Sequence, residues 1–306
     1  MTSAMAATPR LTVVTANLNH GSFLEQAIRS VTEQPGVVLE HLVVDGGSLD
    51  RSVAIVEASG TARLALCPGL DSHAALNRGL ALAEGALIGF LNADDRYESA
   101  SLHRVVAAFD AAPGTVAVCG GLRFFRCDDG PEGTREVELG RYEHAEGDGL
   151  LLEATFGAPG FNSWFFRTDW LRSLGGLRTE WRFAADRDLL LRLLAAARPT
   201  VLRGTVYHYR VHEGSRTLDP RKTNRSAWAR EHIRLARLHA ADDWSGDPER
   251  SALLDDWRAL EGLKLLAGLH RDVSWRSDLL DLFRTPWWRL PSALLRRRQW
   301  LATAAR

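Results

Sequence analysis

Residues 89–95 read Gly89-Phe90-Leu91-Asn92-Ala93-Asp94-Asp95, so an apolar run ends at two adjacent carboxylates. The run over 86–91 is typical of a short buried strand. Open α/β sheets bind ligands outside the carboxyl ends of their strands, where these two acids would lie. Paired carboxylates there suit a hard divalent cation that also binds phosphate oxygens. An isolated Asp-Asp is more often a solvated turn, so the surrounding pattern has to decide.

Strands alternate with helices around this stretch. Apolar runs predict strands at 11–16, 39–44, 62–66 and 86–91, with a helix after each of the first three. The pattern Ser-x-x-Glu at 22–25 predicts a capping box at the start of the first helix, and 74–83 has helical spacing. This alternation to about residue 110 predicts a doubly wound, mostly parallel sheet that binds a nucleotide.

The second half of the chain is less regular. It predicts a strand at 115–119, a hairpin of 122–127 and 134–139 turning at 128–130, an aromatic extended segment at 161–167, a helix at 185–196 and a strand at 205–210. Leucines and other apolar residues recur at helical intervals from about residue 223. We therefore expect a lead-in over 1–10, an α/β domain over 11–219 with halves 11–112 and 113–219, and a helical appendage over 220–306.

Composition narrows the class of protein. The 306 residues carry 38 basic and 38 acidic side chains, which gives no general reason to expect a nucleic-acid partner. Three cysteines without metal-ligand spacing fit a reducing compartment, so a cytoplasmic location is expected. No stretch approaches the ~20 apolar residues that span a bilayer, and residues 1–10 lack the apolar core of a signal peptide.

Five motifs then resemble one known family. They are LTVVTAN at 11–17, VVDGGS at 43–48, ALNRG at 75–79, LNADD at 91–95 and DRDLLLR at 186–192. In this order and spacing they resemble family 2 glycosyltransferases over about residues 10–215. The resemblance implies a GT-A fold and an inverting transfer of a sugar from a nucleoside diphosphate sugar to an acceptor hydroxyl. The acceptor could be a glycan, a lipid-linked sugar or a small molecule.

The chemistry of that reaction gives the acids a task. A metal, Mn²⁺ or Mg²⁺, held by Asp94 and Asp95 would neutralise the departing diphosphate. We expect Asp95 to be the direct ligand and Asp94 to share the metal or contact the ribose. The resemblance also implies that Asp45 accepts a hydrogen bond from the base or ribose. Thr15 and Asn17 would line the base pocket, both largely through their backbone.

Further site residues follow from the resemblance. It places Asn77 and Arg78 near the donor phosphates and sugar, although Arg78 could equally be a solvated helix charge. Just upstream, two acids usual in the family are missing, and Asp71 is the remaining candidate to replace them. His212 would complete the metal shell, and neutral imidazole is a competent ligand for manganese. The last two candidates, for the acceptor pocket, are Asn162 and Trp164.

The general base is a choice between Asp186 and Asp188. At about 100° per residue, Asp186 shares a face with the apolar leucines at 189, 190, 193 and 194, while Asp188 points almost opposite. An acid on an inward face has to be paired, capping or functional. The resemblance independently places the base at Asp186. We therefore expect Asp186 to accept the proton, with helix capping as the alternative, and Asp188 to pair with Arg192.

Two other classes of protein compete with this interpretation. A dinucleotide-dependent enzyme would need a Gly-x-Gly-x-x-Gly turn after the first strand, and the chain has none there. A catalytically silent glycan-binding module could share the fold. Finally, the tail at 287–300 combines tryptophan, leucine and arginine in a way that suits a peripheral helix on an anionic membrane, or packing on the rest of the protein.

Overall fold

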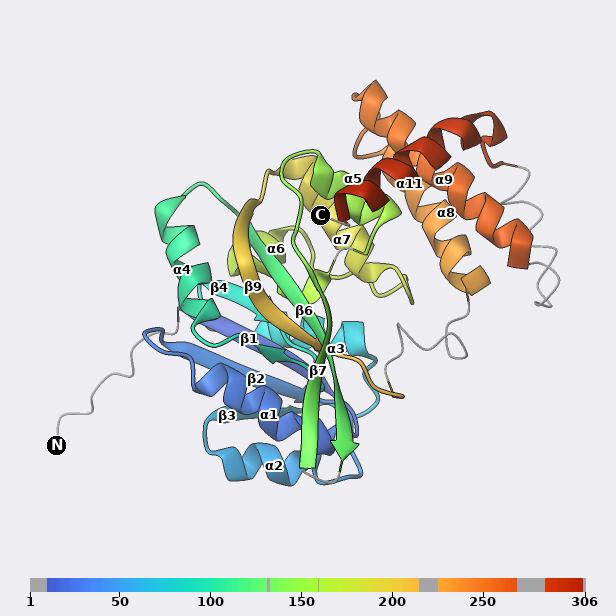
Figure 1. Ribbon diagram of the computed structural model, residues 1–306. Helices are drawn as coiled ribbons and strands as arrows, with labels where there is room; N and C mark the ends of the chain where they lie inside the picture. Colours follow the sequence, from blue (N-terminus) through green and yellow to red (C-terminus); the bar gives the residue numbers. More distant parts are fainter. Residues whose placement is uncertain (1–9, 131–132, 159, 215–224, 269–283, 305–306) are drawn as a thin grey trace. The chain divides into compact units, whose positions relative to one another are not determined.

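A computed structural model describes residues 10–130, 133–158, 160–214, 225–268 and 284–304 of the 306 (Figure 1). The chain forms two compact units. The first comprises Met1–His144, Gly160–Leu177 and Arg198–His212, and the second comprises Ala145–Pro159, Arg178–Ala197 and Glu213–Arg306. This division differs from the single boundary expected at residue 219, because two segments from within the expected catalytic domain belong to the second unit.

The first unit is built on one mixed sheet of nine strands, in the order β3-β2-β1-β4-β8-β6-β9-β5, with β7 paired to β6. The predicted parallel half is confirmed, since β1 pairs in parallel with β2 and β4, and β2 with β3. Its strands are β1 Leu11–Asn17, β2 Leu39–Asp45, β3 Ala62–Leu66 and β4 Leu87–Phe90. The helices between them are α1 Gly21–Thr32, α2 Ser52–Ser59 and α3 Ser72–Leu82, with α4 Ser101–Ala111 following (Figure 1).

Side-chain alternation along β1 explains why the sheet carries helices on both faces. Val13 belongs to the core that includes Ala27 of α1, whereas the next residue, Val14, faces Gly79 of α3. Successive side chains of a strand point to opposite faces, so α1 and α3 cover opposite sides of the sheet. The strand accordingly reads as a continuous apolar run, as strands buried on both faces do.

The second half of the sheet is mixed, as predicted. Strand β8 (Trp164–Arg167) is antiparallel to β4 and β6, whereas β9 (Thr200–Arg210) runs parallel to β6. The short strand β5 (Arg96–Tyr97) pairs with β9. The segments expected at 115–119 and 122–127 form one long strand, β6 (Ala117–Gly130), whose partner in the hairpin is β7 (Gly133–Tyr142). Residues 128–130 therefore belong to the strand rather than to the turn.

Loop aspartates fix the starts of two helices, and the first of these contacts corrects a prediction. Helix α1 begins at Gly21, and Ser22 makes no capping bond, because the Asp50 carboxylate accepts the Gly21 N–H at 2.8 Å. A loop acid thus replaces the predicted capping box. In α3 the N-cap is Asp71, whose carboxylate accepts the Ala74 N–H at 2.8 Å. This gives Asp71 a structural role at the helix start.

The second unit is helical. Its apolar core joins α5 (Gly149–Phe156) and α7 (Ala185–Ala196) to the helices that follow, α8 (Arg225–Ala241), α9 (Pro248–Gly268) and α11 (Leu290–Ala304). Trp257 of α9 and Leu191 of α7 are both fully buried in this core. The remaining short elements are η1 (Phe161–Ser163) and α6 (Thr168–Ser173) in the first unit and η3 (Trp287–Arg289) in the second.

The contact between α3 and β1 can be tested at Gly79. A Cβ atom at this position would lie 2.2 Å from Val14 Cγ1, inside van der Waals contact. Gly79→Ala should therefore destabilise the protein by about 1–3 kcal/mol in chemical unfolding, although alanine is the better helix former. Gly114→Ala, with no neighbour within 4 Å of the new Cβ, is the control. Adding Val14→Ala should recover part of the loss, and additive effects would contradict the clash.

Candidate active site

The carboxyl ends of β1 and β2 form the first cluster of polar side chains. Asp45 is fully buried, and its Oδ2 accepts from Asn17 Nδ2 at 2.6 Å and from the Ser48 hydroxyl at 2.7 Å. Its Oδ1 accepts the Gly47 and Ser48 N–H groups at 3.0 and 2.7 Å. Burial alone would raise the pKa of Asp45, but these hydrogen bonds outweigh it and lower the pKa. Asp45 is thus held as a carboxylate.

The side-chain oxygen of Asn17 takes no part in these hydrogen bonds. Its amide nitrogen donates to Asp45 and to Ser48, yet its Oδ1 is buried and has no hydrogen-bond partner among the described residues. A buried acceptor without a donor costs about 1–3 kcal/mol. Such an atom at the end of a parallel strand is well suited to receive an N–H or O–H from a ligand.

Thr15 is placed differently from its neighbours. Its side chain is fully buried, and its hydroxyl contacts His41 Nε2 of β2 at 2.9 Å. The Thr15 side chain therefore lies in the interior of the sheet, so any contact with a base would come from its backbone.

Asp95 is the acid that points into the protein. It is 2% exposed, and its Oδ1 accepts the Arg210 N–H at 2.6 Å. Its Oδ2 accepts from the Tyr207 hydroxyl at 2.7 Å and from Asn92 Nδ2 at 2.9 Å. Burial raises the pKa of Asp95 to about 7, and repulsion from the neighbouring Asp94 carboxylate contributes to the same shift. These contacts link the end of β4 to β9.

Asp94 is the acid that remains open. Its side chain is 19% exposed, and its Oδ2 lies 3.0 Å from His212 Nε2, although the two residues are 118 positions apart in the chain. The structure thus brings together two of the three expected metal ligands. Of the two acids, Asp94 is better placed than Asp95 to bind a ligand, because both Asp95 oxygens are already hydrogen-bonded.

Phe23 and Arg210 support this pair. The Phe23 ring of α1 packs on the His212 ring with centroids 4.8 Å apart. The Arg210 guanidinium lies 5.0 Å from the centroid of the Phe23 ring. Arg210 also donates from Nε to the Asp94 carbonyl at 2.9 Å and from Nη2 to Gln26 at 2.6 Å. Arg210 therefore fixes the backbone of Asp94, a positioning role that the sequence did not indicate.

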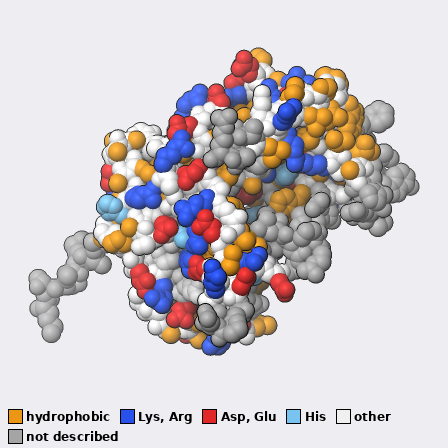
Figure 2. All heavy atoms as spheres, viewed as in Figure 1, with side chains coloured by type: hydrophobic (Ala, Val, Ile, Leu, Met, Phe, Trp, Pro, Cys, Tyr) orange, Lys and Arg blue, Asp and Glu red, His pale blue; other side chains and the backbone are white. Residues whose placement is uncertain are grey.

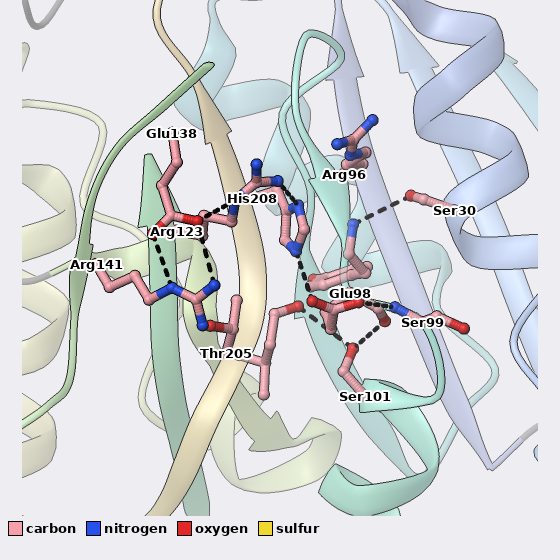
Figure 3. Close-up of polar contacts among 12 residues, drawn as sticks. Ser30, Arg96, Glu98, Ser99, Ser101, Arg123, Glu138, Arg141, Thr205 and His208 are labelled. Atoms are coloured by element: carbon pink, nitrogen blue, oxygen red, sulfur yellow. Dashed lines mark hydrogen bonds and ion pairs between the residues drawn. The ribbon is translucent and has the colours of Figure 1, made fainter. Parts of the chain in front are cut away.

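A polar network holds β9, the strand that supplies Tyr207 and Arg210 (Figure 3). His208 Nε2 contacts Glu98 at 2.9 Å, and His208 Nδ1 contacts Arg123 of β6 at 3.3 Å. Arg123 in turn donates to Glu138 of β7 at 2.9 Å, and Glu138 accepts from Arg141 (Figure 3). Because an arginine only donates, its contact assigns the proton of neutral His208 to Nε2, which then donates to Glu98.

The two residues expected near the donor phosphates lie on α3 but differ in surroundings. Asn77 donates to the Leu177 carbonyl at 2.7 Å and accepts the Leu177 N–H at 2.9 Å, so its amide ties α3 to the turn after α6. This pairing uses both polar groups of Asn77 and explains the residue structurally. Arg78 is exposed on the same helix.

The two expected acceptor-pocket residues also differ. Trp164 is 1% exposed in β8, where its ring packs against His144 with centroids 5.4 Å apart. Its side chain is therefore part of the core, and its contact with an acceptor stays a prediction. Asn162, in η1, is half-buried.

The predicted orientation of the two acids at the start of α7, in the second unit, needs a correction. Asp188 is fully buried and pairs with Arg192 at 2.8 Å, Arg178 at 3.3 Å and His239 at 3.2 Å. Burial alone would raise the pKa of Asp188, but His239 and the arginines outweigh it and lower the pKa. The pairing with Arg192 is confirmed. The helical phasing is wrong, because α7 is buried on almost every side and has no water-facing side opposite its leucines.

Asp186 is the half-buried acid of this pair. Its Oδ1 accepts the Arg187 N–H at 2.7 Å, and no described residue donates to its Oδ2. Glu231 of α8 accepts the N–H groups of residues 182, 183 and 184, which lie at and before the N-cap of α7, whereas Asp186 accepts the N–H of Arg187 in the first turn. Asp186 thus keeps one oxygen available.

Arg187, between the two acids, is a further residue that the sequence analysis missed. Its guanidinium donates to the carbonyls of Ala154, Thr155 and Gly157, at the end of α5. A cation there satisfies carbonyls that lack helical partners and complements the helix dipole. Arg187 therefore fixes the start of α7 on α5, and no local sequence signal identifies this contact.

The mixed sheet and the helices that cover it form a GT-A fold. The chain belongs to the glycosyl transferase family 2, whose family model matches residues 12–172. It is 30% identical over 209 residues to the uncharacterized protein MT1568 of Mycobacterium tuberculosis, covering 63% of this chain and 64% of that protein. It is 35% identical over 114 residues to the succinoglycan biosynthesis protein ExoO of Rhizobium meliloti, covering 36% and 32%. The chain thus spans less than two thirds of the length of these relatives.

Solved structures show the same fold at lower identity. S. aureus TarS in complex with UDP superposes with a TM-score of 0.66 and 18% identity, covering 93% of this chain and 83% of that chain. The mannosyltransferase PcManGT from Pyrobaculum calidifontis, in complex with GDP-Man and Mn²⁺, gives a TM-score of 0.58 at 18% identity, covering 98% and 87%. These likenesses confirm the predicted GT-A fold.

The buried contact between Thr15 and His41 predicts a pH dependence of stability. Burial lowers the pKa of His41 to about 3. The unfolded chain would bind a proton near pH 6.5, so the folded state loses stability as the pH falls below 6.5 towards about 3. Relative to His41→Gln, the wild-type protein should lose about 2 kcal/mol of unfolding free energy between pH 7.5 and pH 5. Chemical unfolding at both pH values measures this, and a constant difference would contradict it.

Proposed function

We propose that the protein is an inverting glycosyltransferase that moves a sugar from a nucleoside diphosphate sugar, UDP-linked, to an acceptor hydroxyl. The observation that carries this proposal is the contact between Asp94 and His212 after β4 and β9, in a sheet whose neighbouring strands end in Asn17 and Asp45. Family membership and the UDP complex of TarS support a nucleotide-sugar donor. The name of ExoO supports a role in glycan or cell-envelope biosynthesis, with a glycan, lipid-linked or small-molecule acceptor.

Asn17 and Asp45 would bind the nucleoside. The buried Asn17 Oδ1 would accept a hydrogen bond from the imide of a uracil-type base, because it has no donor among the described residues. Asp45, held as a carboxylate, would fix Asn17 in this orientation and attract a ribose hydroxyl. Both contacts exist before and during the reaction, so they serve donor binding more than turnover.

Asp94 and His212 fit a divalent cation. Two neighbouring ligands at about 2.1 Å from an octahedral ion lie about 3.0 Å apart, and the oxygen and nitrogen are 3.0 Å apart. Among the described residues no group of three or more His, Cys, Asp or Glu could hold a metal. Such a cation would therefore keep positions for phosphate oxygens, as Mg²⁺ and Mn²⁺ do in nucleotide sites. When bound, Mn²⁺ or Mg²⁺ would neutralise charge on the departing diphosphate.

Asp186 would act as the general base. Its Oδ2 would take the proton of the acceptor hydroxyl while the hydroxyl oxygen bonds to the anomeric carbon. The bond from that carbon to the diphosphate breaks with its electron pair leaving on the diphosphate, and attack from the opposite face inverts the anomeric configuration. The proposal rests on the motif at 186–192 and on the available oxygen of Asp186.

A catalytically silent module on the same fold is the alternative. It would bind a nucleotide or glycan without turnover, and a screen of UDP-, GDP- and dTDP-sugars for donor hydrolysis separates the two functions. Release of a nucleoside diphosphate from one donor supports the enzyme and identifies the donor for the tests that follow.

The metal pair predicts the behaviour of two variants. Asp94→Asn and His212→Ala should each weaken Mn²⁺-dependent binding of UDP at least tenfold in calorimetry, because each removes a ligand from the proposed cation. Asp110→Asn, which changes an exposed acid paired with Arg10, is the matched control and should bind normally. Undiminished UDP binding in EDTA would count against the metal.

The proposed general base, Asp186, predicts different effects of substitution. Asp186→Asn should leave UDP and Mn²⁺ binding near normal and lower transfer by a factor of about 10²–10⁴, the contribution of a positioned general base. Asp188→Asn should instead destabilise the protein by about 3–5 kcal/mol, since it weakens a buried ion pair and leaves Arg192 without its full partner. Initial rates with the identified donor and chemical unfolding distinguish the two. An active Asp186→Asn beside a folded, inactive Asp188→Asn would reverse the assignment.

A further inference from the structure

The charged side chains from residue 282 to residue 306 are all basic. From residue 282 to residue 306 the sequence contains no Asp or Glu, whereas the chain as a whole has equal numbers of acidic and basic residues. The arginines of this segment are Arg284, Arg289, Arg296, Arg297, Arg298 and Arg306. The described part of the segment comprises 284–304 and includes η3 and α11.

A buried acid fixes one face of α11 on α9. Asp256 of α9 is fully buried, and its Oδ1 pairs with Arg289 Nε at 2.8 Å and accepts from Ser292 at 2.6 Å. Its Oδ2 pairs with Arg296 Nε at 2.6 Å. Ala293, between these residues on the same face, is 0% exposed. Two arginines of the segment are therefore used in holding the helix, and the orientation of α11 is set by a carboxylate with three partners.

The opposite face of α11 is apolar and basic. Leu294 and Leu301 are both 48% exposed, and the exposed Arg298 lies between them at helical spacing. Leu295 is 61% exposed on the same helix, and Trp288 of η3 is 79% exposed. Figure 2 shows hydrophobic side chains gathered beside basic ones over α9 and α11. We name Trp288, Leu294, Leu295, Arg298 and Leu301 the exposed face of the tail.

We propose that the exposed face of the tail binds the surface of an anionic lipid bilayer. Tryptophan and leucine would enter the boundary between headgroups and acyl chains, where amphipathic helices bury their apolar side. Arg298 and the half-buried Arg297 would meet lipid phosphates, at about 1 kcal/mol for each cation near an anionic surface. A second copy of this chain fits less well, because the same basic face would meet itself.

The helix would lie on the membrane rather than cross it. No helix within the described ranges is long and apolar enough for a bilayer span. The contact is therefore a peripheral one, and its strength depends on both the apolar side chains and the anionic lipid. This inference does not rest on the proposed sugar transfer, because neither donor nor metal takes part in it.

Flotation of the full chain with vesicles tests the proposal. With vesicles of phosphatidylcholine and about 30% phosphatidylglycerol, most of the wild-type protein should float, while pure phosphatidylcholine should bind it at least tenfold less. The triple variant Trp288→Gln, Leu294→Gln, Leu295→Gln should lose at least tenfold of the anionic binding, and so should Arg297→Gln with Arg298→Gln. Each variant is first shown to be folded by its thermal melting curve.

Matched controls make the outcome decisive. Leu49→Gln and Leu139→Gln change leucines that are 95% and 45% exposed in the first unit, and they should float like the wild type. Equal flotation of the tail variants and the wild type overturns the proposal, as does the absence of wild-type flotation with anionic vesicles. Sedimentation that finds a dimer lost in the triple variant would assign the face to self-association instead, and would also overturn it.

Discussion

The buried carboxylate of Asp95 is the interaction on which the candidate site depends. It joins the end of β4 to β9 by accepting from the Tyr207 hydroxyl and the Arg210 N–H, residues more than a hundred positions away in the chain. Strand β9 leads directly to His212, so the same bonds bring that imidazole to Asp94. A carboxylate buried without such donors would be very costly. The three hydrogen bonds stabilise its charge, and they also fix the geometry of its neighbour.

Adjacent acids thus take unlike environments for a simple geometric reason. After β4 the chain turns, and the Asp95 N–H bonds back to the Asn92 carbonyl. Asp95 points into the sheet, where burial raises its pKa, while Asp94 stays at the surface with His212. A second acid that stayed equally open would add charge repulsion to the site and remove the link to β9. One acid serves the structure, so that the other can be held in place for a ligand.

Much of the fold could be read from the sequence, since strands buried on both faces and helices between them have distinct apolar patterns. The hairpin was also predictable, but its turn was not, because Asp128–Gly130 resemble turn residues and yet continue β6. The site was predictable only in part. Asp94 and His212 are brought together by β9, and the sequence pairs them only through the family resemblance. Local patterns also carry no sign that Asn77 is occupied by the Leu177 backbone or that Trp164 belongs to the core.

The failed phasing of α7 shows where sequence periodicity stops being informative. Helical phasing separates an apolar face from a solvent-facing one, whereas in α7 Ala185 and the residues from Arg187 to Leu193 are all buried. Such a helix can bury charge only if the rest of the protein supplies partners. Arg192 and His239 do so for Asp188, and the α5 carbonyls do so for Arg187. Burial therefore cannot distinguish a catalytic acid from a structural one in this helix. The proposed base, Asp186, differs from Asp188 in its hydrogen bonds: both oxygens of Asp188 have partners, whereas no described residue donates to Asp186 Oδ2.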